Sequence, residues 1–132
     1  MPPRVLFDTD VLIDASRGVS DAVTALRDAA RKYEVAISAI TRMELIVGCR
    51  DTRELRATEV FVKRFTVLPV DEPASNEAVE LLVQYRLSHG LLIPDALIAA
   101  TAIKARLRFV TKNLKDYKYL PTLDLAPYPP TF

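Results

Sequence analysis

Three aspartates fall within seven positions near the start of the chain, directly after a short apolar run. They are Asp8, Asp10 and Asp14 in VLFDTDVLID, residues 5–14. Such a set suits a turn that opens a helix, the nucleophile and acid/base of a phosphatase, or part of a metal site. Taken alone, Asp8 and Asp10 are explained by the turn, because aspartate favours both turns and helix starts.

Further oxygen-bearing side chains lie in three later stretches. Glu44 lies in SAITRMELIVG, where its spacing from Thr41 also suits a capping box. Asp95 lies in IPDALIAATAI, where the first turn of a helix favours a negative charge. The stretch RFVTKNLKDY adds a hydroxyl, an amide and a carboxylate, each of which a turn would explain: Thr111, Asn113 and Asp116.

The elements that must position these side chains form an alternating pattern. Four apolar runs predict strands over 4–7, 35–38, 66–70 and 108–111. Apolar residues at helical spacing between them predict helix faces packed on a sheet: Val23, Leu26 and Tyr33; Leu55, Thr58, Val62 and Phe65; Ala78, Leu81, Leu82 and Tyr85; Leu97, Ile98, Thr101 and Ala105. The alternation predicts an α/β fold with a central parallel sheet flanked by helices.

Helix ends are marked by the residues that usually stand there. Asp51 and Glu54 have capping-box spacing, and Pro94 suits a first helical turn. The three glycines fall where helices should stop: Gly18, Gly48 and Gly90.

Separate turns explain each acidic residue but not their joint placement. Ligands of an open parallel sheet bind beyond the carboxyl ends of its strands. Asp8, Glu44 and either Asn113 or Asp116 are expected near such ends, and Asp95 lies on a helix that could face them. Carboxylates gathered there repel one another unless a cation joins them. Mg²⁺ or Mn²⁺ prefers oxygen ligands, and its natural chemistry here is phosphodiester hydrolysis.

Composition bounds the remaining possibilities. The 132 residues predict a single domain, 1–132, and a formal charge of +1 points to neither nucleic acid nor an anionic membrane as partner. The chain does not open on a secretion-type apolar stretch, and Pro94 and Asp95 interrupt its longest apolar region. We therefore expect a soluble, cytoplasmic protein that does not enter a membrane.

Thiol, zinc and nucleotide-loop chemistry have little support. Cys49 is the only cysteine and is expected to be a buried structural thiol. His89 is the only histidine and lacks ligand-like spacing, which disfavours zinc and a serine triad. The chain carries no phosphate-binding or dinucleotide-binding glycine loop.

The sequence resembles the PIN domain, particularly the VapC-type ribonuclease toxins of prokaryotic toxin–antitoxin pairs. FDTDVLID, SAITRMELIVG, GLLIPDALIAATAI and FVTKNLKDY carry the resemblance, in that order over nearly the whole chain. It implies a PIN-like three-layer fold whose first and fourth strands are adjacent. It also implies a metal-dependent endoribonuclease that acts as the toxin of a type II toxin–antitoxin system.

The resemblance assigns expected roles to the acidic residues. Asp8, Glu44 and Asp95 correspond to the three acids that hold Mg²⁺ or Mn²⁺. The family's further acid falls on TKNLKD, where this chain has Asn113 first and Asp116 three residues later, so either could be the fourth site residue.

Neighbouring residues receive supporting roles from the same resemblance. Thr9 and Thr111 are expected to orient water or a carboxylate. Asp10 is expected to support the ligands indirectly, and Asp14 to lie on a helix surface.

The expected partners are RNA, an antitoxin and a second copy of the chain. Lys112 and Lys115 lie beside the proposed metal site and could hold RNA phosphates, with Arg42 and Arg17 as weaker candidates. By resemblance, a small cognate antitoxin should block the acidic crevice, and the toxin should form a homodimer.

Three rival interpretations remain. A haloacid-dehalogenase-like phosphatase would use Asp8 as nucleophile and Asp10 as acid/base, but Leu12 stands where that pattern has threonine. A non-catalytic PIN-like module that binds RNA or protein is supported by Asn113 in place of an acid. A phospho-receiver with Asp71 as acceptor is the most distant alternative.

Overall fold

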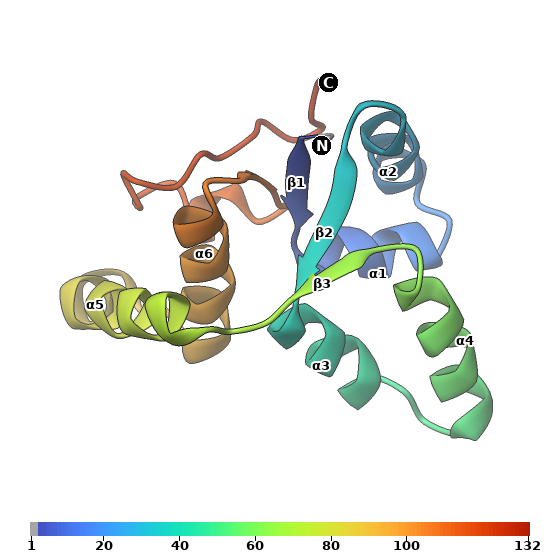
Figure 1. Cartoon of the computed structure of the whole chain (residues 1–132), viewed down its shortest axis with the longest axis horizontal. Helices are drawn as coiled ribbons and strands as arrows, with labels where there is room; N and C mark the ends of the chain where they lie inside the picture. Colours follow the sequence, from blue (N-terminus) through green and yellow to red (C-terminus); the bar gives the residue numbers. More distant parts are fainter. Residues whose placement is uncertain (1–2) are drawn as a thin grey trace.

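Four parallel strands run through the centre of the computed structural model, which describes residues 3–132 (Figure 1). They are β1 (Arg4–Phe7), β2 (Glu34–Ser38), β3 (Thr66–Leu68) and β4 (Arg108–Val110). All four predicted strands are confirmed, with ends shifted by no more than two residues. The sheet order β3-β2-β1-β4 places the first and fourth strands side by side, as the family resemblance implied.

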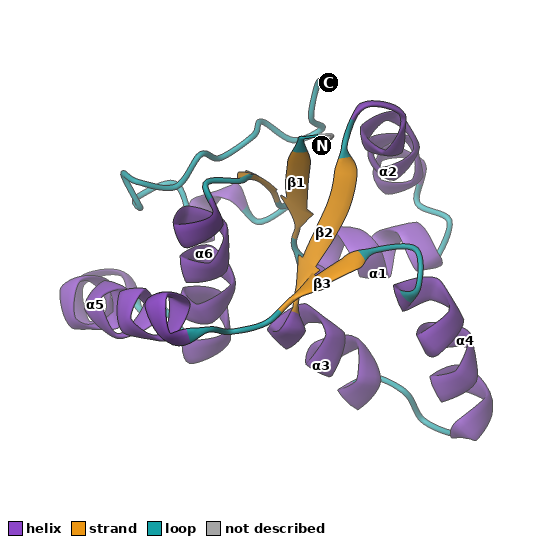
Figure 2. Cartoon of the chain, viewed as in Figure 1, coloured by secondary structure: helices purple, strands orange, loops and turns teal. Residues whose placement is uncertain are grey.

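Helices connect the strands and cover the sheet on both faces (Figure 2). The described helices are α1 (Thr9–Ser16), α2 (Ser20–Lys32), α3 (Ala39–Val47), α4 (Thr52–Val62), α5 (Glu72–His89) and α6 (Ile93–Ala105), followed by the short 3₁₀ helix η1 (Leu114–Asp116). Pro94 lies in the first turn of α6, and Asp51 caps α4 by accepting the Glu54 N–H, as the sequence predicts. Gly90 ends α5 with φ 73°, in the left-handed region that glycine adopts without strain.

The sheet separates two hydrophobic clusters because successive strand side chains point to opposite faces. Val5 and Phe7 pack with α1 and α2 on one face. Leu6 and Phe109 pack with α6 on the other. This arrangement confirms a three-layer α/β fold and leaves the carboxyl ends of the strands free to carry polar residues.

The expected packing of α5 on the sheet is wrong. α5 packs chiefly on α6, outside the layer that covers the sheet (Figure 1). The reason lies in α6, which is apolar on nearly every side and rich in small buried residues such as Ala96, Ala99 and Ala100. A helix of that kind is covered on two faces, here by the sheet and by α5.

Cys49 is half-buried rather than buried, and its Sγ lies 3.2 Å from the Thr58 hydroxyl. Among residues 3–132, none of the helices has the length and apolar character needed to span a bilayer. The expected domain 1–132 remains a prediction, and its first two residues lie outside the described part of the chain.

Candidate functional site

Asp8 follows β1 directly and is almost fully buried, with 5% of its surface exposed. Its backbone N–H donates to the Val110 carbonyl at 2.8 Å, which ties it to the end of β4. Its carboxylate caps α1 by accepting the Thr9 N–H and also accepts the Thr111 hydroxyl, both at 2.8 Å. The helix cap predicted for this position is therefore real, but the same carboxylate also faces the junction of β1 and β4.

Burial, helped by the charges of Asp10 and Asp95, raises the pKa of Asp8 to about 7. The hydrogen bonds from Thr111 and Thr9 oppose this shift but do not cancel it. Burial disfavours an isolated carboxylate because a charge loses solvation in a medium of low dielectric constant. A proton or a cation would relieve that cost.

Asp10 holds the segment that follows β4. Its Oδ2 accepts the backbone N–H groups of Lys112 and Asn113, each at 3.1 Å. Burial raises its pKa, and these hydrogen bonds lower it. Asp14, one turn later, accepts the Lys112 ammonium at 2.8 Å. α1 therefore fixes the backbone that carries the candidate residues after β4.

Glu44 does not belong to a capping box with Thr41, so that expectation is wrong. Helix α3 begins at Ala39, and its cap is Ser38, whose hydroxyl accepts the Ile40 N–H at 3.0 Å. Thr41 is fully buried within the helix, with its hydroxyl 3.0 Å from that of Thr9. The Thr9 hydroxyl donates to a Glu44 carboxylate oxygen at 2.7 Å. Glu44 therefore lies beside Thr9, the residue that directly follows Asp8.

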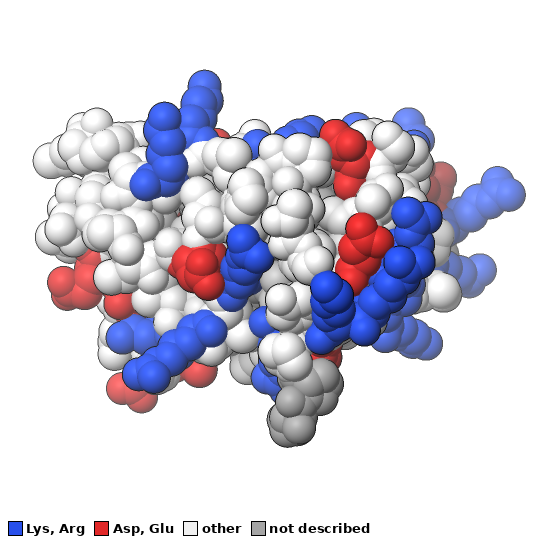
Figure 3. All heavy atoms as spheres, turned by 90° about the horizontal axis from the view of Figure 1, so that it is seen from above, with Lys and Arg blue, Asp and Glu red and all other residues white. Residues whose placement is uncertain are grey.

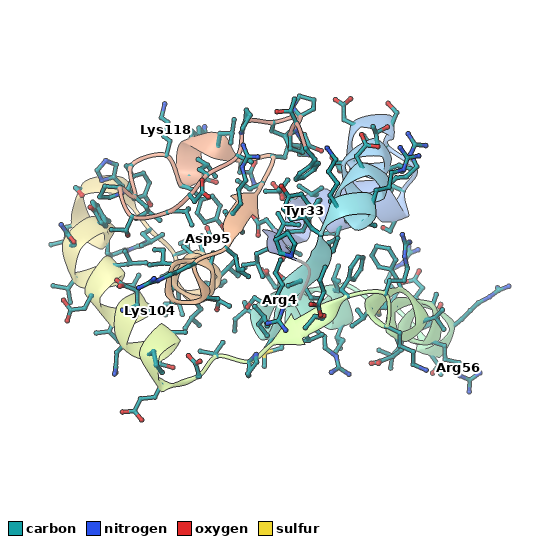
Figure 4. The ribbon with its side chains drawn as sticks, turned by 45° about the horizontal axis from the view of Figure 1, so that its top comes forward. Arg4, Tyr33, Arg56, Asp95, Lys104 and Lys118 are labelled. Carbon is teal, nitrogen blue, oxygen red and sulfur yellow. The ribbon has the colours of Figure 1, made fainter. Side chains whose placement is uncertain are left out.

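Asp95 in the first turn of α6 accepts the phenolic hydroxyl of Tyr117 at 3.1 Å. Burial raises the pKa of Asp95, the Tyr117 bond lowers it, and the charges of Asp116, Glu44 and Asp10 raise it. Burial, followed by the charges of Asp8 and Asp95, raises the pKa of Tyr117, so this phenol stays protonated between the two carboxylates. In Figure 4 Asp95 lies within the molecule, whereas Lys118 and Arg56 extend outward.

Tyr117 was not predicted as a site residue. The sequence shows only an aromatic residue after Asp116, at a position where a core residue is the ordinary expectation. Its hydroxyl reaches a residue 22 positions earlier because η1 folds back over the start of α6, and no local pattern encodes that approach.

Asn113 and Asp116 take different places beside these acids. Asn113 contacts the cluster through its backbone N–H, which donates to Asp10. Asp116 lies with Asp95 on the wall of one hollow, and its charge acts on Asp95 more strongly than that of Glu44. Either residue remains a candidate for the fourth position.

The basic candidates differ in what they contact. Lys112 is paired with Asp14, and Arg42 is paired with Glu59 at 3.3 Å. Lys115 is exposed and lines the hollow beside Asp95, without an ion pair to any residue of the described part. Arg17 lines a second hollow, of about 670 Å³, which also contains Glu44. Asp71, the acceptor of the phospho-receiver alternative, caps α5 by accepting the Ala74 N–H at 3.0 Å.

The chemistry of these donors fits a hard divalent cation. Four residues offer carboxylate oxygens: Asp8, Glu44, Asp95 and Asp116. Their negative charges repel one another, since Asp95 raises the pKa of Asp8, and Asp116 and Glu44 raise the pKa of Asp95. Within residues 3–132, no three His, Cys, Asp or Glu side chains are close enough together to share a metal ion. Mg²⁺ commonly uses one or two carboxylates and completes its shell with water and substrate phosphate, so this geometry suits that mode of binding.

A comparison with protein families matches residues 5–119 to the PIN domain. Ribonuclease VapC10 of Mycobacterium tuberculosis is 38% identical over 111 residues, which cover 83% of each chain. Ribonuclease VapC19 of the same organism is 34% identical over 93% of this chain and 98% of that protein.

Solved structures are also similar to this chain over most of its length. A toxin–antitoxin complex from Klebsiella pneumoniae contains a chain that is 33% identical, with a TM-score of 0.78 over 97% of this chain and 99% of that one. A chain of VapBC2 from Rickettsia felis, bound to a DNA fragment from its promoter, is 25% identical, with a TM-score of 0.79 over 92% of this chain and 96% of that one.

Proposed function

This chain belongs to the PIN-domain family, and on that premise we propose that it is a metal-dependent endoribonuclease, the toxin of a type II toxin–antitoxin system. The names of the relatives, Ribonuclease VapC10 and Ribonuclease VapC19, support the nuclease activity. Family membership also disfavours the haloacid-dehalogenase-like alternative.

The observation that carries this function is the buried carboxylate of Asp8 beside other carboxylates that lack a basic partner in the described part of the chain. Asp8, Glu44 and Asp95 form no ion pair with a lysine or arginine of residues 3–132. A structural salt-bridge network would supply those cations, whereas a catalytic site leaves the negative charge for a metal and its substrate.

One or two of the carboxylates of Asp8, Glu44 and Asp95 would hold Mg²⁺ or Mn²⁺ directly, and water and substrate phosphate would complete the shell of the cation. Such a cation supplies an activated water at neutral pH and offsets the negative charge that develops on a phosphodiester. The protein's own residues fix the geometry. Thr111 orients Asp8, Thr9 orients Glu44, and Tyr117 orients Asp95.

The substrate strand would be held by basic residues at the same edge. Lys115 is available for a phosphate, while Lys112 must first leave Asp14 and Arg42 must leave Glu59. Asp10 keeps the backbone of residues 112 and 113 in place as the strand binds.

The proposed protein partners are an antitoxin and a second copy of the chain. The similar structures are toxin–antitoxin complexes, which supports an antitoxin that covers the acidic crevice. Exposed apolar residues on α5 and at the start of α6 would suit a homodimer: Val83, Leu87, Leu92 and Ile93.

The test is cleavage of a mixed pool of structured RNAs by antitoxin-free protein, with Mg²⁺, with Mn²⁺ and with chelator. Asp95→Asn is compared with Asp21→Asn, which makes the same change in the first turn of α2 at an exposed position. We expect metal-dependent cleavage by the wild type and Asp21→Asn but not by folded Asp95→Asn. Folded wild type that neither cleaves RNA nor binds metal would instead support the non-catalytic binding module.

A further inference from the structure

A hollow of about 150 Å³ opens beside Asp95, between the end of α5, the start of α6 and η1. His89 and Tyr119 form part of its wall, together with Lys115 and Asp116. The volume is well below that of pockets for drug-sized ligands, so it suits a single flat ring system. Because the hollow shares Asp95 with the candidate site, its occupant would lie next to the reacting group.

The aromatic wall is already assembled. The rings of His89 and Tyr119 are stacked, with centroids 4.1 Å apart and planes 14° from parallel. The ring of Tyr85 packs beside both, with its centroid 5.9 Å from that of His89 and 5.3 Å from that of Tyr119. Ser88 lies 2.7 Å from Nδ1 of His89 and further restricts the imidazole. Because the two rings cover each other's facing sides, a base that binds here stacks on the outer face of an already ordered pair.

Polar groups border this surface on the side of η1. Lys115 is free of ion pairs within the described chain and supplies a positive charge for a phosphate. Asp116, equally free of ion pairs there, supplies a carboxylate that accepts N–H groups. An aromatic surface, a cation and an acceptor together match one nucleotide, with its base on the outer face of the His89–Tyr119 pair and its phosphate on Lys115.

We propose that this hollow, lined by His89, Tyr119, Lys115 and Asp116, binds the nucleobase next to the scissile phosphate and sets the base preference of cleavage. The inference rests on the proposed nuclease function, to which it adds a specificity site. Stacking on an aromatic surface strengthens with the area of the base, so the site favours a purine.

The first test measures base preference with RNAs that differ only at the positions flanking one cleavage site. Wild type should favour a purine at one fixed position by about three- to tenfold, because the larger base gains a part of the free energy that stacking contributes per base. His89→Ala and Tyr119→Leu should reduce this preference to about twofold or less, whereas Tyr119→Phe, which keeps the ring, should retain it. Gln84→Ala, an exposed substitution on the same helix, is the control and should cleave like wild type.

The second test does not require cleavage. His89 is the only histidine, so its imidazole signals in an NMR spectrum of tag-free protein need no further assignment. In the presence of chelator, a short purine-rich RNA should shift those signals more than a pyrimidine-rich RNA of equal length. Tyr119→Leu should reduce the shift, and Tyr119→Phe should preserve it.

The two tests separate the specificity site from the nuclease activity. Cleavage whose base preference is absent, or is unchanged in His89→Ala, would overturn the specificity site and leave the nuclease standing. An RNA-dependent shift of the His89 signals without any cleavage would support the base site and count against the nuclease. Absence of both the shift and the preference would overturn the base site.

Discussion

Asp8 combines two roles that oppose each other electrostatically. As the cap of α1 it gains hydrogen bonds from Thr9 and Thr111, which favour the charged form. As a buried neighbour of Asp10 it loses solvation and meets a like charge, and these effects dominate, bringing its pKa to about 7. The residue is therefore costly to ionise in the metal-free protein, as expected of a group placed for binding rather than for stability.

We expect Asp8→Asn to stabilise the metal-free protein at neutral pH. The pKa of Asp8 is higher in the folded than in the unfolded protein. Its contribution to the free energy of unfolding is therefore fully present below about pH 4 and is lost as the pH rises to about 7. Asparagine has no charge to bury, so its advantage should reach about 4 kcal/mol above pH 7 and shrink towards pH 4, since each unit by which the pKa rises above 3.8 corresponds to about 1.4 kcal/mol. Urea unfolding in chelator across this range measures the difference. If the difference in unfolding free energy between Asp8→Asn and wild type instead increases as the pH falls, the pKa of Asp8 is not raised.

Tyr117→Phe should weaken metal binding without unfolding the protein. The ring keeps its packing against Phe109, while Asp95 loses the only hydroxyl that the structure shows bonded to it. Partners that orient metal ligands affect affinity by about 10- to 100-fold. We expect a shift of that size in the Mn²⁺ concentration needed for half-maximal cleavage. Tyr33→Phe, remote from the acids, is the control, and equal effects of the two variants would rule out a specific role for Tyr117.

At the residue scale, the sequence indicated the acids and the two threonines that bond them, Thr9 and Thr111, but not the tyrosines beside them. Asp8 and Asp95 stand out because one follows β1 and the other opens α6, and Glu44 stands out because it lies in the helix that follows β2. Tyr117 and Tyr119 do not, because a tyrosine among apolar residues is equally typical of a core. Their contacts join residues that are far apart in the chain, and a local pattern carries no information on such pairs.

At the element scale, periodicity was sufficient for the strands but not for the order of the layers. A buried strand and an amphipathic helix differ in length and in the spacing of their apolar residues, so both can be predicted from the sequence. The spacing of Ala78, Leu81 and Leu82 shows that α5 has an apolar face but not which surface covers it. The structure places that face chiefly on α6, whose small residues allow the close approach.

The turn between α5 and α6 should depend on Gly90. Its φ of 73° is strained for any residue with a side chain, although a Cβ there would meet no neighbour within 4 Å. Gly90→Ala should therefore cost about 1 kcal/mol through the backbone alone. Gly48→Ala is the matched control, because Gly48 ends α3 at an ordinary φ of −72° and should tolerate a Cβ with little loss. Thermal unfolding compares them, and equal losses would contradict a backbone cause.

At the scale of the whole molecule, the overall surface charge does not by itself favour the proposed binding of RNA and metal. The face above the amino ends of the strands carries acidic and basic side chains interspersed (Figure 3). This mixture agrees with a net charge of +1. Attraction for a substrate must therefore be local, at the opposite edge of the sheet where the carboxylates gather.

If that edge binds a divalent cation, the whole fold should become more stable when the cation is present. A ligand that binds only the folded state adds about 1 to 3 kcal/mol at 10 to 100 times its dissociation constant. Mn²⁺ should therefore raise the Tm of wild type above its value in NaCl of the same ionic strength, which controls for screening. Asp21→Asn should keep this rise and Asp95→Asn should lose most of it. An equal rise in both variants would mean that the cation binds elsewhere, and the placement of Asp8 after β1 and of Glu44 in α3 would then need another explanation.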